Sequence, residues 1–237
     1  RVVMGVLYNS RIVTDGLVLC LDAGDKMSYP GAGTTWTDLS KNKNNGTLTN
    51  GPTFDSANGG SIVFDGTDDY INIGSMIANI NNAFTVEVYL RRTGNGTNWP
   101  RIFLNGQVNT SITITQYNNT TGVLFRIKPT SGSWIEYNLP TGTMVNNQWL
   151  SLSFSYEGSI MRAFINGVEY GSGYSISKTI TTPTSENPYI GGDGNSTGDP
   201  SGSSFDGHMS NVRVYNRALS AQEIRQNYNA TKGRFGL

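Results

Sequence analysis

Aromatic side chains in polar, loop-like segments are the residues of this sequence best suited to hold a ligand. Trp99 lies in the segment NGTNWP, Tyr117 is followed by Asn118 and Asn119, and Trp134 is a third candidate. Aromatic rings beside amide groups combine an apolar face with hydrogen-bonding groups, as protein–sugar sites commonly do. We therefore expect Trp99, Tyr117, Asn118 and Asn119 to bind a ligand. The alternative is that Trp99 closes one end of the fold or contacts a neighbouring subunit.

A second possible chemistry is the binding of calcium by one glycine-rich loop. The loop GGDGNSTGDPSGSSFD contains Asp193, Asn195, Asp199 and Asp206. Because Ca²⁺ prefers carboxylate, amide and carbonyl oxygens on a bendable loop, these four residues are the expected ligands of a Ca²⁺ cofactor. The loop DLSKNKNNG, which begins at Asp38, offers a second set of such oxygens. The alternative for both loops is that Asp, Asn and Gly simply form turns.

The sequence lacks the pairs of groups that catalysis requires. Glycosidases place two carboxylates on either side of the scissile bond, and Glu87 is followed on its predicted strand by Val88 and Tyr89. A Ser-His-Asp triad would have to use His208, the single histidine, which we expect to be structural because it stands beside Gly207 at the start of a strand. We therefore expect no catalytic residue and no enzyme activity.

Composition excludes two classes of partner. The 237 residues include 17 Lys+Arg and 17 Asp+Glu, so the net charge is +0 and no basic excess is present to neutralise phosphates. No apolar run approaches the length of a membrane span. We expect neither nucleic acid nor a membrane as a partner. Cys20 is the only cysteine, so an internal disulfide is impossible and a buried apolar role is expected.

Short strands with alternating faces are the elements that must position these residues. In the segment 149–156 one face is apolar and the other carries Trp149 and three serines; the apolar residues are Leu150, Leu152, Phe154 and Tyr156. Asn-Gly pairs at 105–106 and 166–167 predict tight hairpins. Many such strands, separated by turns, predict an all-β fold made of a two-sheet antiparallel sandwich.

One short helix is predicted near the end of the chain. A strand precedes it in which Val212 and Val214 face a core while the residues between them face away. Ser220 and Glu223 have the spacing of a capping box, and the flanking apolar residues Leu219 and Ile224 are placed to staple it. These signals predict a helix over about 221–231 that stops at Gly233.

Several of these segments resemble the concanavalin A-like (laminin G-type) jelly-roll family. The resemblance rests, in order, on FTVEVYLRR, QWLSLSFSYEGSIMRAFINGVEYGSG and SSFDGHMSNVRVYNRALSAQEI. It implies a jelly-roll sandwich. The glucanases of this fold carry their acids as E-x-D-x-E, which this sequence lacks. Pentraxins, which are similar in the closing block, hold calcium in the loop that corresponds to Asp193–Asp206, but with a denser acidic run.

The opening YNSRIVTDGLVLCLDAGDKMSYPG and the ending NYNATKGRFGL resemble the version of this domain in structural proteins of tailed bacteriophages. That resemblance implies a virion protein, as a capsid decoration, head fibre or tail-fibre component, located on the particle surface. Its expected partners are other virion proteins, host glycans and further copies of itself in a homo-oligomer. We expect an N-terminal arm (1–15), a jelly-roll (16–231) and a C-terminal tail (232–237), with both ends as anchors. The alternatives are a soluble lectin-like carbohydrate-binding module and, less favoured, a glycoside hydrolase.

Overall fold

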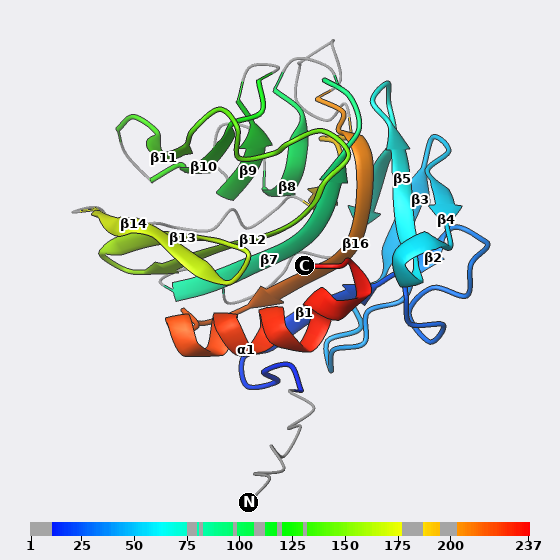
Figure 1. Ribbon diagram of the computed structural model, residues 1–237, viewed down its shortest axis with the longest axis horizontal. Helices are drawn as coiled ribbons and strands as arrows, with labels where there is room; N and C mark the ends of the chain where they lie inside the picture. Colours follow the sequence, from blue (N-terminus) through cyan, green and yellow to red (C-terminus); the bar gives the residue numbers. More distant parts are fainter. Residues whose placement is uncertain are drawn as a thin grey trace, which may run out of the picture.

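A computed structural model describes residues 11–74, 80, 83–96, 99–106, 112–117, 120–129, 132–176, 187–194 and 203–237. These residues form two antiparallel sheets and one C-terminal helix, which confirms the predicted fold class (Figure 1). Within this part of the chain, no helix is long and apolar enough to cross a bilayer.

The first sheet has the strand order β14-β13-β12-β7-β16-β5-β4, and β1 also pairs with β16. Its strands are β1 (Leu17–Asp22), β4 (Thr53–Asp55), β5 (Ser61–Asp65), β7 (Ala83–Arg92), β12 (Trp149–Glu157), β13 (Ile160–Ile165), β14 (Val168–Ser175) and β16 (Asp206–Tyr215). The long strands β12, β7 and β16 lie side by side at its centre. Phe154 faces Val86 across one pair, and Val212 faces Val88 across the other.

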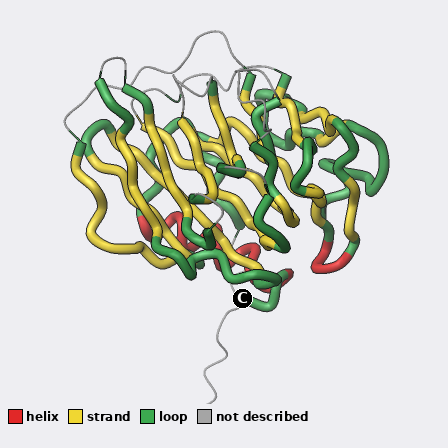
Figure 2. The backbone as a smooth tube through the Cα atoms, turned by 90° about the horizontal axis from the view of Figure 1, so that it is seen from above, coloured by secondary structure: helices red, strands yellow, loops and turns green. Residues whose placement is uncertain are grey.

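The second sheet has the order β11-β10-β9-β8-β15-β6-β3-β2. Its strands are β2 (Thr35–Trp36), β3 (Gly46–Thr49), β6 (Tyr70–Ile73), β8 (Arg101–Asn105), β9 (Ile112–Gln116), β10 (Val123–Ile127), β11 (Ile135–Leu139) and β15 (Pro188–Ile190). Figure 2 shows the strands running side by side when the molecule is seen from above.

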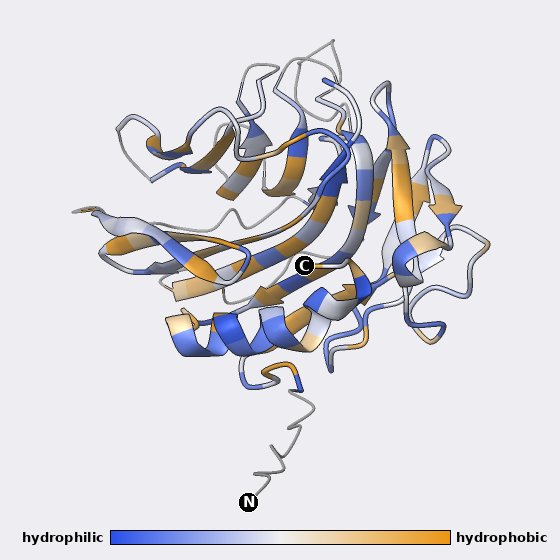
Figure 3. Cartoon of the chain, viewed as in Figure 1, coloured by the Kyte–Doolittle hydropathy of each residue, from blue (hydrophilic) through white to orange (hydrophobic). Residues whose placement is uncertain are grey.

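The core lies between the inner faces of the two sheets. Alternate residues of each strand point into it, and orange bands along the strands of Figure 3 mark these apolar positions. On β7 the core-facing residues are fully buried; they are Phe84, Val86, Val88 and Leu90. Burial of each such side chain stabilises the fold by about 1.5–3 kcal/mol. Strand alternation therefore predicts the core faces correctly.

The hairpin predictions had different outcomes. Asn166 and Gly167 join β13 to β14 with φ of 52° and 72°, as a two-residue turn requires. The predicted tight turn at 105–106 is wrong, because Asn105 pairs with Ile112 and is therefore the last residue of β8 rather than a turn residue. An Asn-Gly pair permits left-handed backbone angles but does not fix where the next strand starts.

The helix α1 (Ala221–Thr231) follows the predicted cap. The Ser220 hydroxyl accepts from the Glu223 amide at 3.3 Å, and the Glu223 carboxylate accepts from the Ser220 amide at 2.8 Å. Leu219 and Ile224 are both buried in one apolar cluster, so the predicted staple is confirmed. Gly233 does not stop the helix in a left-handed conformation; the chain passes instead into the 3₁₀ turn η2 (Lys232–Arg234).

The helix and the residues after it cover the outer face of the first sheet (Figure 1). Arg213 and Tyr215 point away from the core as predicted, yet they are 3% and 0% exposed. Phe235 lies 5.1 Å from the ring of Tyr89 and 4.5 Å from the ring of Trp149. The apolar content of the C-terminal tail is thus accounted for by packing within the domain.

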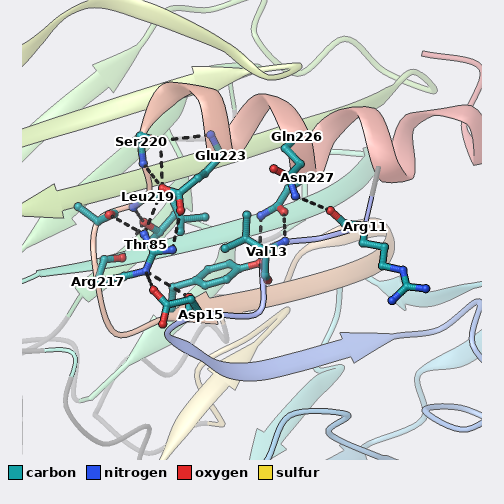
Figure 4. Close-up of polar contacts among 12 residues, drawn as sticks. Arg11, Val13, Asp15, Thr85, Arg217, Leu219, Ser220, Glu223, Gln226 and Asn227 are labelled. Carbon is teal, nitrogen blue, oxygen red and sulfur yellow. Dashed lines mark hydrogen bonds and ion pairs between the residues drawn. The ribbon is translucent and has the colours of Figure 1, made fainter. Parts of the chain in front are cut away.

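Polar contacts tie residues 11–15 of the predicted arm to α1, to the end of β16 and to the segment between them (Figure 4). The Val13 amide donates to Asn227 Oδ1 at 2.7 Å, and the Tyr215 hydroxyl donates to the Val13 carbonyl at 3.0 Å. Asp15 forms an ion pair with Arg217 at 2.8 Å. This part of the arm therefore belongs to the packed domain, whereas residues 1–10 lie outside the described part of the chain.

Candidate functional site

Aromatic and charged side chains gather at one end of the outer face of the second sheet. We call them the aromatic cluster, which consists of Trp99, Tyr117, Arg126, Lys128, Trp134 and Glu136. They come from the segment before β8, the residue after β9, β10 with the residue after it, and β11 with the residue before it. On β10, Phe125 and Ile127 face the core, so alternation turns Arg126 outward. Because β9 and β11 lie on either side of β10 in the sheet, the other residues of the aromatic cluster lie beside Arg126.

Arg126 is the centre of this cluster. Its guanidinium carbon lies 4.3 Å from the ring centroid of Trp134 and 5.8 Å from that of Trp99. Arg126 Nη2 also pairs with Glu136 Oε1 at 3.0 Å. Cation–π contacts of this kind are each worth about 0.5–2 kcal/mol, depending on solvent exposure. Two rings and a carboxylate therefore hold the arginine in one orientation before any ligand arrives.

Trp99 has a strained backbone at the edge of the cluster. Its φ is 54°, a left-handed value that a bulky side chain rarely adopts. Such strain costs about 1–3 kcal/mol and is concentrated at functional sites. The Thr115 hydroxyl donates to the Trp99 carbonyl at 3.0 Å, and Tyr117 packs edge-to-face on its ring at 5.3 Å. Tyr117 is 44% exposed, so the cluster reaches solvent.

The structure brings together the three predicted aromatic residues, Trp99, Tyr117 and Trp134. The predicted partners Asn118 and Asn119 lie outside the described residues. Sequence reasoning did not select Arg126 or Lys128. Lys128 Nζ lies 5.7 Å from the Trp134 ring and donates to the Gly132 carbonyl at 2.9 Å. The run VLFRIK carried a signal for both, because alternation puts its two cations on one face.

The calcium prediction is not decided by the described residues. Asn195 and Asp199 lie outside them. Asp193 is buried, and Asp206 Oδ1 accepts a hydrogen bond from the Thr93 hydroxyl at 2.7 Å. Two of the four predicted ligands, Asp193 and Asp206, are thus among the described residues. The calcium site stays a prediction.

In the second candidate loop, Asp38 is a structural residue. Its fully buried carboxylate accepts from the backbone amides of Cys20, Ser40 and Asn44, each at 2.8 Å. A separate acidic group, Asp65, Asp68 and Asp69, brings its carboxylate oxygens within 4.8 Å of one another in the turn after β5. There Asp69 accepts from the Asp65 amide at 3.0 Å. Both arrangements show acidic residues organising turns.

His208 is not arranged for catalysis. Its Nε2 accepts from Arg91 Nη2 at 2.7 Å, while Nδ1 faces both Ser61 Oγ at 3.1 Å and Asp55 Oδ2 at 3.6 Å. A hydrolytic triad needs the serine and the aspartate on opposite nitrogens. Ser61 is also fully buried. Burial, followed by the charge of Arg91, lowers the pKa of His208, which favours the neutral structural form.

Glu87 is covered by α1. It is 3% exposed, accepts from Asn227 Nδ2 at 2.8 Å and lies 3.9 Å from Arg213 Nη1. Burial raises its pKa to about 6. A perturbed carboxyl can mark an active site. Here the helix separates it from any polysaccharide, so its role is to fasten α1 to the sheet.

Comparison with known proteins identifies the family of the fold. Residues 65–225, more than half of the chain, match a family model described as the concanavalin A-like lectin/glucanases superfamily. No curated protein matches the sequence.

Solved structures with the same fold include clostridial toxin domains. The binding domain of Paraclostridial Mosquitocidal Protein 1 is 16% identical with a TM-score of 0.71, over 91% of this chain and 52% of that one. The binding domain of botulinum neurotoxin serotype D is 14% identical with a TM-score of 0.68, over 91% and 52%. That of botulinum neurotoxin DC, in complex with rat synaptotagmin II, is 11% identical with a TM-score of 0.70, over 92% and 52%. This chain spans about half of each. At these identities the likeness is one of fold, and with the family match it shows that the chain belongs to the concanavalin A-like lectin/glucanases superfamily.

Proposed function

We propose that the protein is a non-catalytic glycan-recognition module on the surface of a bacteriophage particle, with the aromatic cluster as its contact surface. One observation carries the recognition part of this proposal. Trp99, Tyr117 and Trp134 come from three separate segments and meet in one group: Arg126 contacts both tryptophans, and Tyr117 packs on Trp99. Structural packing alone has little need for a strained tryptophan and an exposed tyrosine at this place.

The chemistry of the cluster suits a sugar. The ring faces of Trp134 and Tyr117 can cover the apolar face of a pyranose, while Arg126, Lys128 and Glu136 can exchange hydrogen bonds with its hydroxyls. Because contacts to both rings and to Glu136 already fix Arg126, little side-chain entropy is lost when a ligand binds.

The same cluster argues for binding rather than hydrolysis. A glycosidase needs two carboxyl groups facing one another across the substrate. Glu136 is the single carboxylate of the aromatic cluster, and it is paired with Arg126. An assay for reducing sugars released from the polysaccharide that binds best is expected to stay flat.

The virion part of the proposal has a different support. It rests on the resemblance of the opening and closing segments to structural proteins of tailed phages, and it makes the termini the places of attachment. The test is mass spectrometry of gradient-purified phage particles that were produced in cells expressing the tagged chain. We expect the chain to copurify with capsid or tail proteins. Its absence from particles would leave the alternative, a soluble lectin-like module.

A glycan array tests the recognition part. The wild-type chain is expected to bind a subset of the array, and Trp134→Ala is expected to reduce that signal at least tenfold. Met27→Ala is the control, because Met27 is 78% exposed in the loop after β1 and lies outside the cluster. A wild-type chain that binds no glycan would refute the proposal. A repeat in EDTA tests the calcium prediction, because signal lost in EDTA and restored by Ca²⁺ would support it.

A further inference from the structure

Three tyrosines meet where the edge strands of the two sheets come together. We call them the tyrosine shelf: Tyr137 of β11, with Tyr170 and Tyr174 of β14. The ring of Tyr137 stacks on that of Tyr174 at 6.2 Å and 25°, and it lies 6.4 Å from the ring of Tyr170. The Tyr137 hydroxyl donates to the Tyr170 carbonyl at 2.6 Å. Contacts from both sheets therefore fix the position of this group.

Two of these rings are left in water. Tyr170 is 37% exposed and Tyr174 is 46% exposed, although the partners opposite them on β13, Ala163 and Met161, are fully buried. β14 thus carries core-facing side chains beyond the point where the second sheet can cover them. Exposed rings that are held in a fixed arrangement are typical of contact surfaces.

The backbone of β14 is shaped to present these rings. The residues between them are Gly171, Ser172 and Gly173, and the two glycines have left-handed φ values of 68° and 81°. The register of β14 against β13 shifts here, as in a β-bulge. A Cβ on Gly171 would lie 3.0 Å from the Tyr137 hydroxyl. Bulges commonly re-aim side chains beside functional sites, and this one leaves only a serine side chain between the two rings.

The shelf and the aromatic cluster share one strand. Trp134 immediately precedes β11, and Tyr137 stands three residues further along. At about 3.3 Å per residue, the two positions are about 10 Å apart. Trp134 contacts Arg126 on the outer face of the sheet, whereas Tyr137 lies on the inner face, packs against the core and donates from there to β14. The two aromatic groups therefore lie on opposite faces of β11, and because β11 is the edge strand of its sheet, a long ligand can pass over it and touch both.

We propose that the tyrosine shelf is a second contact site for the same ligand, so that the protein binds an extended glycan chain rather than a single terminal sugar. The inference rests on the proposed function. Tyrosine suits this role because it offers a large contact area at low entropic cost. Two sites joined by one ligand raise its affinity beyond that of either site alone. Pairing of β14 with a second copy is the competing use of this edge, and the bulge at Gly171–Gly173 disfavours it by interrupting a regular ladder.

Titration calorimetry with a length series of one oligosaccharide tests this inference. The series is made from the polysaccharide that binds best on the array, from the disaccharide to the octasaccharide. For the wild-type chain we expect the affinity to rise at least tenfold along the series. In the double variant Tyr170→Ser/Tyr174→Ser the gain with length is expected to disappear. Val168→Ser is the control: it is a 55% exposed residue of the same strand and is expected to keep the gain.

Three results would overturn the inference. One is a gain with length that persists in the double variant, with thermal unfolding showing that this variant is folded. Another is a wild-type dimer in sedimentation velocity that the double variant converts to a monomer, which would assign the shelf to self-association. The third is a wild-type affinity that does not change with length while Trp134→Ala abolishes binding. That result leaves the proposed function intact, whereas a wild-type chain that binds no oligosaccharide removes both.

Discussion

At the scale of single residues, the buried charges beneath α1 show how this domain uses polar groups. Glu87 and Arg213 are 3% and 3% exposed and lie 3.9 Å apart, a distance too long for a hydrogen bond between them. Asn227 on α1 supplies the closer contact to the carboxylate, at 2.8 Å. Removal of one partner would leave a buried charge without compensation, which is costly. The contacts of Glu87 therefore fix the position of α1 on the sheet.

Replacement of Glu87 by glutamine is predicted to change how stability depends on pH. The pKa of Glu87 is raised from 4.5 to about 6 in the folded chain, so the folded state holds this proton more tightly than the unfolded state. Its contribution to the free energy of unfolding is present below pH 4.5 and is lost as the pH rises through 6. The loss is about 2 kcal/mol.

Urea unfolding at pH 4, 5.5 and 7 measures this effect. The stability advantage of the wild-type chain over Glu87→Gln is expected to shrink by about 2 kcal/mol from pH 4 to pH 7. Glu157→Gln, at an exposed glutamate, provides the control. A difference that is constant with pH, or that grows, would contradict this explanation of the buried carboxyl.

Some of the residues of the candidate site could be predicted from the sequence, and others could not. Trp99, Tyr117 and Trp134 could be selected because large aromatic residues in polar segments are unusual. Their mutual contacts could not be predicted, because these depend on β9, β10 and β11 lying next to one another in the sheet. Arg126 gained its role only from that neighbourhood, since a lone arginine on a strand is ordinarily a solvated residue.

At the scale of elements, the sequence predicted which face of each strand points into the core, but it did not predict what covers the opposite face. Alternation identified the core face of β12, but its serine face is equally buried, with Ser151, Ser153 and Ser155 each 2% exposed. The cause is α1, which packs from a distant part of the chain onto this outer face. The alternation within a strand cannot show that a distant helix packs on its outer face. The capping box and staple, by contrast, are local signals, and both were predicted correctly.

Loss of the N-cap of α1 is predicted to destabilise the domain. Ser220→Ala removes the hydroxyl that accepts from the Glu223 amide, which costs about 1 kcal/mol in the free energy of unfolding. The matched control is Ser56→Ala, because Ser56 also stands at the N-cap of a helical turn but its side chain makes no capping hydrogen bond. Chemical unfolding of the two variants should separate them. Equal stabilities would show that the capping box contributes nothing here.

At the scale of the whole molecule, the two ends of the described chain lie on one side and the proposed ligand surface on the other. Residues 11–15 and Phe235 pack at the outer face of the first sheet, beside α1. The aromatic cluster lies on the outer face of the second sheet. Figure 1 shows the strands that carry it, β9, β10 and β11, on the side of the molecule away from α1. Attachment through either of these ends would therefore leave the cluster facing away from the point of attachment.

The contacts of residues 11–15 predict a sharp boundary for N-terminal deletion. Removal of residues 1–15 leaves the buried Asn227 and Tyr215 without the partners that Val13 provides, which costs about 3 kcal/mol of stability. Removal of residues 1–10 keeps those partners and serves as the control. Urea unfolding of the two deletions makes the comparison, and equal stabilities would show that these contacts do not hold the domain together.

The central claim is that the aromatic cluster is the glycan-contacting surface, and calorimetric titration of the strongest array ligand tests it most directly. We predict that Trp134→Ala weakens binding at least tenfold, while Trp134→Phe, which keeps an aromatic face, loses less and Met27→Ala binds within twofold of the wild-type chain. Thermal unfolding of each variant confirms that it is folded. A folded Trp134→Ala variant that binds the glycan as tightly as the wild-type chain would contradict the claim.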